Sequence, residues 1–155
     1  MLLRKNSFFV SLILLLAALS CESFAVDNRS ALARQNYILN CQGCHLADGA
    51  GSKDKVPRLT DFVAYFLYVE GGREFILQVP GAANAPINDG ELADVMNWLL
   101  RNFSGEQLPE NFVPYSSDEV GKLRKEPMID IISRRATLIK RIQDKIGISV
   151  DGLSG

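Results

Sequence analysis

Apolar residues recur at helical spacing in two long stretches of the chain, and these stretches predict its two longest helices. The first helix is expected over residues 89–103, where the apolar stripe comprises Leu92, Val95, Met96, Leu99 and Leu100. Asn88 is followed three residues later by Glu91, and this approximate capping box marks the start of the helix. The second helix is expected over residues 128–145, with Pro127 in its first turn.

Shorter apolar stretches predict further helices, so we expect an all-α fold. A loose stripe runs from residue 28 to residue 41, and the remaining short helices are expected over 62–69, 73–79 and 116–125. Thr60 or Asp61 is the expected N-cap of the helix over 62–69. Glycine and proline residues predict loops over 46–59 and 81–86. The expected organisation is a helical domain at 26–104, followed by a strap and a basic amphipathic helical extension at 105–155.

The N-terminus carries the features of an export signal. Two basic residues precede an apolar run, Leu12–Leu19, that is short for a membrane span. Small residues at Ser23 and Ala25 occupy the −3 and −1 positions of a cleavage site, which predicts a signal peptide over 1–25. Two alternatives, an uncleaved anchor and a lipid attached at Cys21, also imply export. The expected location is the periplasm.

The segment Cys41-Gln42-Gly43-Cys44-His45 carries the candidate chemistry of the chain. A Cys-x-x-Cys pair followed at once by histidine is the pattern that attaches a c-type haem. Cys41 and Cys44, which would share one face of a helix, would form thioethers with the macrocycle, and His45 would bind the iron from the same side. Because His45 is the only histidine in the chain, we expect one covalently bound haem c, with iron as its metal.

Two other uses of the cysteine pair fit the sequence less well. A redox-active pair does not require a histidine directly after it. A structural zinc site takes four ligands, and the chain beyond residue 25 has no cysteine or histidine other than Cys41, Cys44 and His45. Haem attachment also takes place outside the cytoplasm, in agreement with the predicted export.

Further segments extend the haem pattern. The run Val56-Pro57-Arg58-Leu59 follows a glycine-containing loop, and the expected helix that ends this region carries Trp98. With these segments, residues 28–104 resemble a class I c-type cytochrome. The resemblance implies a cytochrome c-like haem domain in which His45 is the proximal iron ligand and Pro57 belongs to the proximal loop. A backbone carbonyl near Pro57 would accept the free ring N–H of His45, and Trp98 would lie where the last helix crosses the first.

The sequence departs from this family at the second axial position of the iron. Class I cytochromes usually place a methionine there, often followed by proline, in the loop before the last helix. Here Val79 precedes Pro80, so these two residues are expected on the distal side. We expect an open or water-bound sixth position, and the alternatives are Met128 from the extension and a weak amide ligand from Asn84. Met96 lies on the apolar stripe of its helix, where packing explains it.

Charge is divided between the two parts of the chain. Residues 26–121 hold seven Lys/Arg and thirteen Asp/Glu, whereas residues 122–146 hold eight and three. A basic amphipathic helix can lie on its own acidic domain, which we favour, or it can guide the docking of a charged partner. Contact with a membrane surface is a less favoured use of the same helix. No nucleic-acid partner is expected of an exported haem protein.

These observations favour a periplasmic monohaem cytochrome that carries single electrons between a donor, such as a periplasmic dehydrogenase, and a downstream acceptor. The expected partners are therefore redox proteins. The alternative is an open-site haem protein that binds or senses a small ligand such as a diatomic gas. An enzyme comes third, because the chain has no second histidine for O–O cleavage and Arg58 and Arg73 alone are weak evidence.

Overall fold

The computed structural model describes residues 28–53, 55–126 and 128–148. The expected signal peptide at 1–25, with Cys21, and the expected helical proline Pro127 lie outside these residues. The chain divides into two compact units, Met1–Leu32 and Ala33–Gly155. Residues 28–32 of the first unit are helical, and the second unit contains all the elements discussed below.

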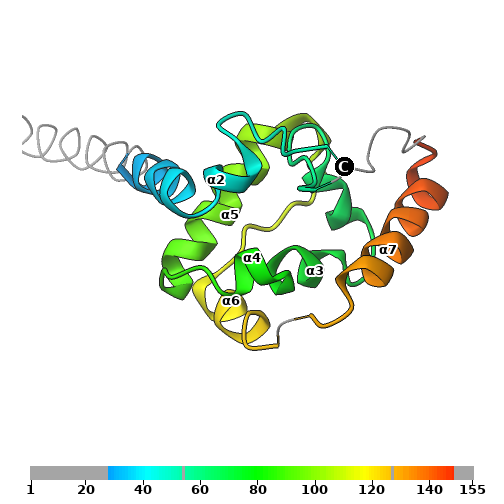
Figure 1. The fold of residues 1–155 in the computed structure, drawn as a ribbon. Helices are drawn as coiled ribbons and strands as arrows, with labels where there is room; N and C mark the ends of the chain where they lie inside the picture. The colour runs from blue at the N-terminus through cyan, green and yellow to red at the C-terminus, as the bar shows by residue number, and fades with distance from the viewer. Residues whose placement is uncertain (1–27, 54, 127, 149–155) are drawn as a thin grey trace, which may run out of the picture. The chain divides into compact units, whose positions relative to one another are not determined.

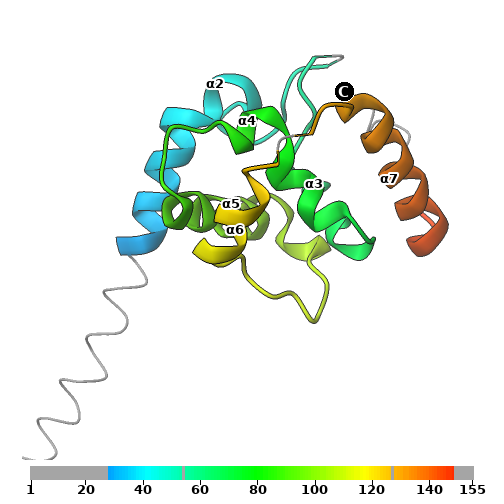
Figure 2. The same ribbon diagram turned by 90° about the horizontal axis from the view of Figure 1, so that it is seen from below.

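The second unit is helical, as predicted. It begins with helical residues 33–40 and continues with α2 (Gln42–His45), the 3₁₀ helix η1 (Val63–Tyr68), α3 (Gly72–Gln78), α4 (Pro80–Ala83), α5 (Asp89–Ser104), the 3₁₀ helix η2 (Gly105–Gln107), α6 (Ser117–Leu123) and α7 (Ile131–Ile146). Figures 1 and 2 show these elements from two directions. The described residues form no strand, and their only β-type pairing is an isolated bridge between Ser52 and Val56. Among these helices none has the length and apolar character needed to cross a membrane.

Helix α5 forms within one residue of its predicted bounds, and its predicted capping box is confirmed. The Asn88 side chain accepts the Glu91 N–H at 2.9 Å, and the Glu91 carboxylate accepts the Asn88 N–H at 3.0 Å. The predicted contact between the first and last helices of the domain is also present. The ring of Tyr37, from residues 33–40, lies 5.3 Å from that of Trp98 and 5.1 Å from that of Phe103.

The helix predicted over 62–69 is instead a 3₁₀ helix without the predicted cap. Its first flanking residue is Phe62, and no side chain caps it. The Thr60 hydroxyl donates to the carbonyl of Asp48 rather than to the helix, and Asp61 adopts a left-handed φ of 55°. The Asp61 N–H donates to the carbonyl of Phe103 at 2.7 Å, so neither expected residue caps the segment, which forms the tighter helix that is common in short connecting pieces.

The prediction of a loop over 81–86 was wrong in part, because residues Pro80–Ala83 form the short helix α4. Val79 is extended, with φ −62° and ψ 141°, as the residue before a proline usually is. Pro80 occupies the first helical position, where its fixed φ and missing N–H cost little. Val79 therefore separates α3 from α4.

The strap and α6 are fastened to the preceding domain by polar contacts. Arg73 donates to both carboxylate oxygens of Glu119, at 2.5 and 2.8 Å. Tyr115 donates its backbone N–H to the Asn97 side chain at 2.8 Å and its hydroxyl to the carbonyl of Arg73 at 2.8 Å. Ser116 caps α6 as predicted, and α6 packs along α5 (Figure 2).

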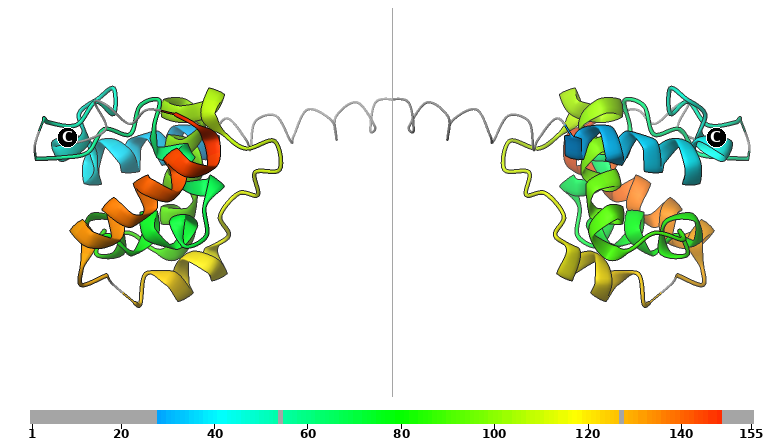
Figure 3. Two further views of the ribbon diagram at one scale, coloured as in Figure 1. Left: turned by 90° about the vertical axis from the view of Figure 1, so that its right-hand side faces the viewer. Right: turned by 90° about the vertical axis from the view of Figure 1, so that its left-hand side faces the viewer.

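Helix α7 starts later than the predicted residue 128. Asp130 is its N-cap and accepts the Ser133 N–H at 3.1 Å. Met128 instead donates its backbone N–H to the carbonyl of Gln78 at 3.0 Å, so it belongs to the connection rather than to the helix. Beyond this point α7 packs against η1 (Figure 3). The amphipathic pattern is borne out in part, since Leu138 and Ile142 are fully buried whereas Ile132, which belongs to the same predicted stripe, is exposed.

Candidate haem site

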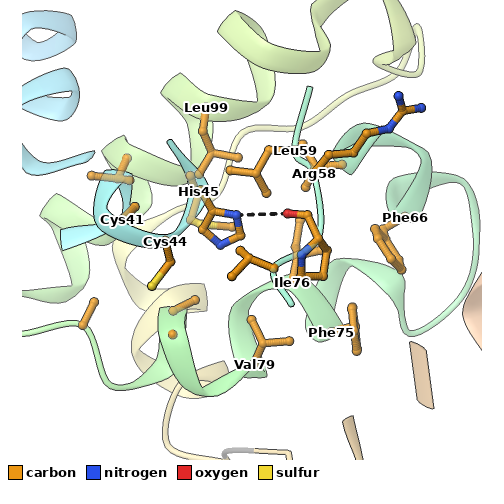
Figure 4. Close-up of a pocket in the computed structure, with 18 of the residues that line it drawn as sticks. Cys41, Cys44, His45, Arg58, Leu59, Phe66, Phe75, Ile76, Val79 and Leu99 are labelled. Atoms are coloured by element: carbon orange, nitrogen blue, oxygen red, sulfur yellow. Dashed lines mark hydrogen bonds between the residues drawn. The ribbon is translucent and has the colours of Figure 1, made fainter. Parts of the chain in front are cut away.

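An apolar cavity of about 320 Å³ lies within the second unit and is bordered by the cysteine–histidine motif (Figure 4). Its walls come from residues 40–45, 55–66, 75–85 and 92–99 and from two residues of α7. This volume is at the lower end of the range for small-molecule and cofactor sites. The apolar residues on its walls include Phe62, Val63, Phe66, Phe75, Ile76, Val79, Leu92, Val95 and Leu99.

The two thiols border this cavity and are not joined in a disulfide. Cys44 lies on α2 and is exposed, whereas Cys41 precedes α2 in a non-helical conformation and is half-buried. The expectation that one helix would carry both cysteines is therefore wrong in this detail, although both reach the same cavity. Burial, and secondarily the neighbouring Cys44, raises the pKa of the Cys41 thiol, which keeps it protonated at neutral pH.

The predicted hydrogen bond between the histidine ring and the proline loop is present. His45 Nδ1 lies 3.1 Å from the Pro57 carbonyl oxygen, shown as the dashed line in Figure 4. Because a carbonyl only accepts, the proton of the neutral ring belongs on Nδ1 and the lone pair of Nε2 is left for a metal. Burial lowers the pKa of His45, and the Pro57 hydrogen bond opposes that shift. The ring is therefore neutral and oriented, as a metal ligand must be.

The loop between His45 and Pro57 is built to hold this carbonyl in place. Gly51 has a left-handed φ of 68°, and its N–H donates to the His45 carbonyl at 3.1 Å. A Cβ at Gly51 would meet the Val56 carbonyl oxygen and would lie 2.8 Å from that of Pro57. Only glycine fits here. On the other side of the motif, Tyr37 donates its hydroxyl to the Leu46 carbonyl at 2.7 Å.

The other side of the histidine faces apolar side chains. In Figure 4, Leu59 and Leu99 lie on one side of the His45 ring, and Ile76 and Val79 lie on the other. Val79 therefore lines the cavity. Pro80, which we expected beside it, does not line the cavity and instead begins α4.

Of the three side chains considered for the sixth iron position, one lines the cavity and two do not. Met96 is buried and lines the cavity from α5. Met128 does not line it but borders a different, open depression beside Ser133 of α7. Asn84 is exposed and likewise absent from the cavity wall. The two alternatives to an open sixth position, Met128 and Asn84, therefore do not lie at the cavity.

The sequence reasoning placed no residue of α7 at the cavity. Ile131 and Arg135, one helical turn apart on α7, line the same cavity as the cysteine motif. The apolar stripe of α7 correctly predicted a buried face, but no local pattern indicated which surface that face would cover. The position of Arg135, one turn before the buried Leu138 and two turns before the buried Ile142, was the only available signal.

The residues present fit a haem. The walls are apolar, two free thiols and one oriented imidazole stand at one end, and no aspartate or glutamate is among the described lining residues. The described part of the chain also contains no group of three or more His, Cys, Asp or Glu side chains that could hold a bare metal ion. A metal at His45 would therefore have to arrive inside a macrocycle that supplies its other ligands.

Comparison with known proteins points the same way. The chain is 29% identical over 106 residues to cytochrome c-552 of Thermus thermophilus, a match that covers 57% of this chain and 81% of that protein. It is also 29% identical over 106 residues to the cytochrome c-552 of one particular strain of the same organism. This second match covers 57% of this chain and 72% of that protein. No family model and no solved structure matches the chain. On an all-α, cytochrome c-like fold, this likeness supports a c-type cytochrome with covalently bound haem c and iron, which is an electron-transfer haem protein rather than an enzyme.

Proposed function

We propose that this chain is a periplasmic monohaem cytochrome that carries one electron at a time between redox partner proteins. Cys41 and Cys44 would hold the haem by thioethers, and His45 would be the proximal iron ligand. The observation that carries the proposal is the 3.1 Å hydrogen bond from His45 Nδ1 to the Pro57 carbonyl, beside two free thiols. It orients the ring and leaves Nε2 for iron.

Haem supplies the one-electron chemistry through its iron, and the residues of this chain bind, orient and shield it. In attachment, each thiol adds across a vinyl group: sulfur bonds to one vinyl carbon and a hydrogen adds to the other. The apolar walls exclude water, so the small change in charge at the site requires little reorganisation. The exposed Cys44 marks the open side of the cavity, where a partner such as a dehydrogenase could approach.

The remaining features of the proposal follow the sequence. Residues 1–25 would be a signal peptide removed on export, residues 26–104 the haem domain, and residues 105–155 an extension. The polar contacts of Arg73 and Tyr115 support an extension that packs on its own domain. A protein of this kind works with redox partners.

The test is covalent haem content after production with a periplasmic haem-attachment system. We expect the wild-type protein to gain the mass of one haem and to keep its haem absorbance after denaturation. C41S and C44S should each leave one thioether, and the double variant should hold no covalent haem. Cys21→Ser, in the expected signal peptide, is the matched control and should leave the mature protein unchanged. A wild-type protein that carries no covalent haem would contradict the proposal.

A second candidate function is supported by the apolar far side of the cavity. Ile76 and Val79 offer no ligand atom opposite His45, and Met128 and Asn84 do not line the cavity. Met96 lines it from α5, where packing on the apolar stripe explains it. An iron with an open or water-bound sixth position would bind diatomic gases. Exposure of the reduced protein to carbon monoxide distinguishes the two functions: rapid binding favours the gas-binding protein, whereas an unchanged low-spin spectrum favours the carrier.

A further inference from the structure

Arg135 occupies an unusual place on α7. The buried face of this helix is formed at i, i+4, i+7 and i+11 by Ile131, Arg135, Leu138 and Ile142. Three of these four residues are apolar, and Leu138 and Ile142 are fully buried. A guanidinium therefore stands where the helical pattern calls for an apolar side chain, and it borders the same cavity as Cys41 and His45.

The surroundings of Arg135 differ from those of the other cations at the cavity. Lys55 and Arg58 also line it, but both are exposed to solvent. Arg135 is partly buried, its guanidinium lies 5.8 Å from the ring centroid of Phe62, and burial lowers its pKa. The described side chains that line the cavity include no carboxylate, whereas Arg135 brings a positive charge to its wall. A partly buried cation at the wall suits a negatively charged group.

We propose that Arg135 is a positioning residue that binds a carboxylate of the cavity's bound group, which makes α7 part of the haem site. The inference rests on the proposed function, because haem is an apolar macrocycle that carries two carboxylates. The planar guanidinium can bind a carboxylate through two parallel hydrogen bonds. Ile131, one turn earlier, would contribute apolar contact from the same helix.

A cation held in this place should also influence the iron. A fixed positive charge at a partly buried site interacts strongly with a nearby redox centre, because the local dielectric is low. It favours the reduced state, which carries one positive charge fewer. Removing the charge should therefore lower the reduction potential, whereas a loss of packing alone has no such fixed direction.

The experiment compares three variants of the full, haem-loaded chain. R135L removes the charge and places an apolar residue on an apolar face, so the fold should be retained. R135K keeps the charge, and K140L removes a charge from the exposed side of the same helix. We expect R135L to lower the midpoint potential, R135K to restore most of the wild-type value and K140L to leave it unchanged. Circular dichroism and the thermal unfolding midpoint establish that each variant is folded.

Two results would overturn the inference, and they are distinguishable from a failure of the proposed function. If wild-type protein carries covalent haem but R135L and K140L have the same potential, the Arg135 inference alone fails. If the midpoint potential of R135K is as low as that of R135L, the charge is not the cause of the change, and the Arg135 inference again fails alone. If the wild-type protein attaches no haem, both proposals fail together.

Discussion

The backbone N–H of Met128 donates to the carbonyl of Gln78 at 3.0 Å, directly before Val79 in the chain. This bond fixes the connection between α6 and α7 beside the end of α3. It brings the Met128 backbone next to the neighbour of the expected distal residue, yet the Met128 side chain does not line the cavity. The connection between α6 and α7 therefore meets the end of α3 here without placing the Met128 sulfur at the cavity.

Replacing Met128 with alanine should leave the visible spectrum of the haem-loaded protein unchanged in both redox states. The side chain packs only partly against the core, so the free energy of unfolding should fall by no more than about 2 kcal/mol. Absorption spectra and chemical unfolding measure the two effects. A change from low-spin to high-spin iron in M128A would restore Met128 as the sixth ligand.

Replacing Val79 with methionine should introduce the ligand that class I c-type cytochromes usually have. Val79 lines the cavity on the opposite side of His45 from Leu99, so a longer sulfur-containing side chain there would reach into the same space. We expect V79M to give a low-spin spectrum, a higher reduction potential and slower binding of carbon monoxide. V79L, which has similar bulk but no sulfur, is the control and should keep the wild-type spin state.

Gly51→Ala should disturb the orientation of the histidine. The added Cβ would press on the carbonyl oxygens of Val56 and Pro57, and the left-handed φ of 68° is unfavourable for alanine. We expect a loss of about 1–3 kcal/mol in the free energy of unfolding and a changed haem spectrum. Gly105→Ala is the matched control, because a Cβ there meets nothing within 4 Å. Equal stability and identical spectra for the two variants would contradict this role of the loop.

Tyr115 should make the protein less stable at alkaline pH. Burial raises the pKa of Tyr115, the charge of Arg73 opposes this shift, and Glu119 and Glu74 add to it. An unfolded chain ionises tyrosine near pH 10. Above that pH the unfolded state binds fewer protons than the folded state, so the free energy of unfolding falls as pH rises. Y115F should lose about 1 kcal/mol at neutral pH, with the hydrogen bond to the Arg73 carbonyl, but decline less above pH 10. Parallel declines in both proteins would exclude Tyr115 as the cause.

Arg124 should hold the segment around α4. Its guanidinium donates to the carbonyls of Ala83, Ala85 and Ile87 at 3.1, 2.5 and 2.8 Å and to the Asp89 carboxylate at 3.2 Å. Arg124→Ala leaves these carbonyls without their donor, so a loss of about 2–4 kcal/mol is expected. Hydrogen exchange should accelerate at residues 82–87 in particular. Lys125→Ala, at an exposed neighbouring position, should do neither.

Local chemistry in the sequence was sufficient for much of this structure. The capping box at Asn88 and Glu91 and the apolar stripe that follows predicted α5 to within a residue, because both signals act within a few residues. The five-residue motif and the following loop predicted that a carbonyl near Pro57 would accept the ring N–H of His45, and the structure identifies that carbonyl as the one of Pro57 itself.

Local sequence patterns could not predict features that depend on contacts between residues far apart in the chain. Thr60 has the right chemistry for a helix cap, but the Asp48 carbonyl, twelve residues earlier, takes its hydroxyl. The start of α7 was misplaced because Met128 is held by Gln78, fifty residues before it. The place of Arg135 at the cavity depends on how α7 packs against η1, and no short pattern encodes that packing.

The placement of Ile131 and Arg135 has a consequence for the order of assembly. A chain that emerges from its N-terminus presents Cys41, Cys44 and His45 about ninety residues before the last wall of the cavity. Until α7 packs against η1, the cavity lacks the part of its wall that Ile131 and Arg135 provide. A haem attached at the motif before that packing would therefore be less enclosed than in the complete fold.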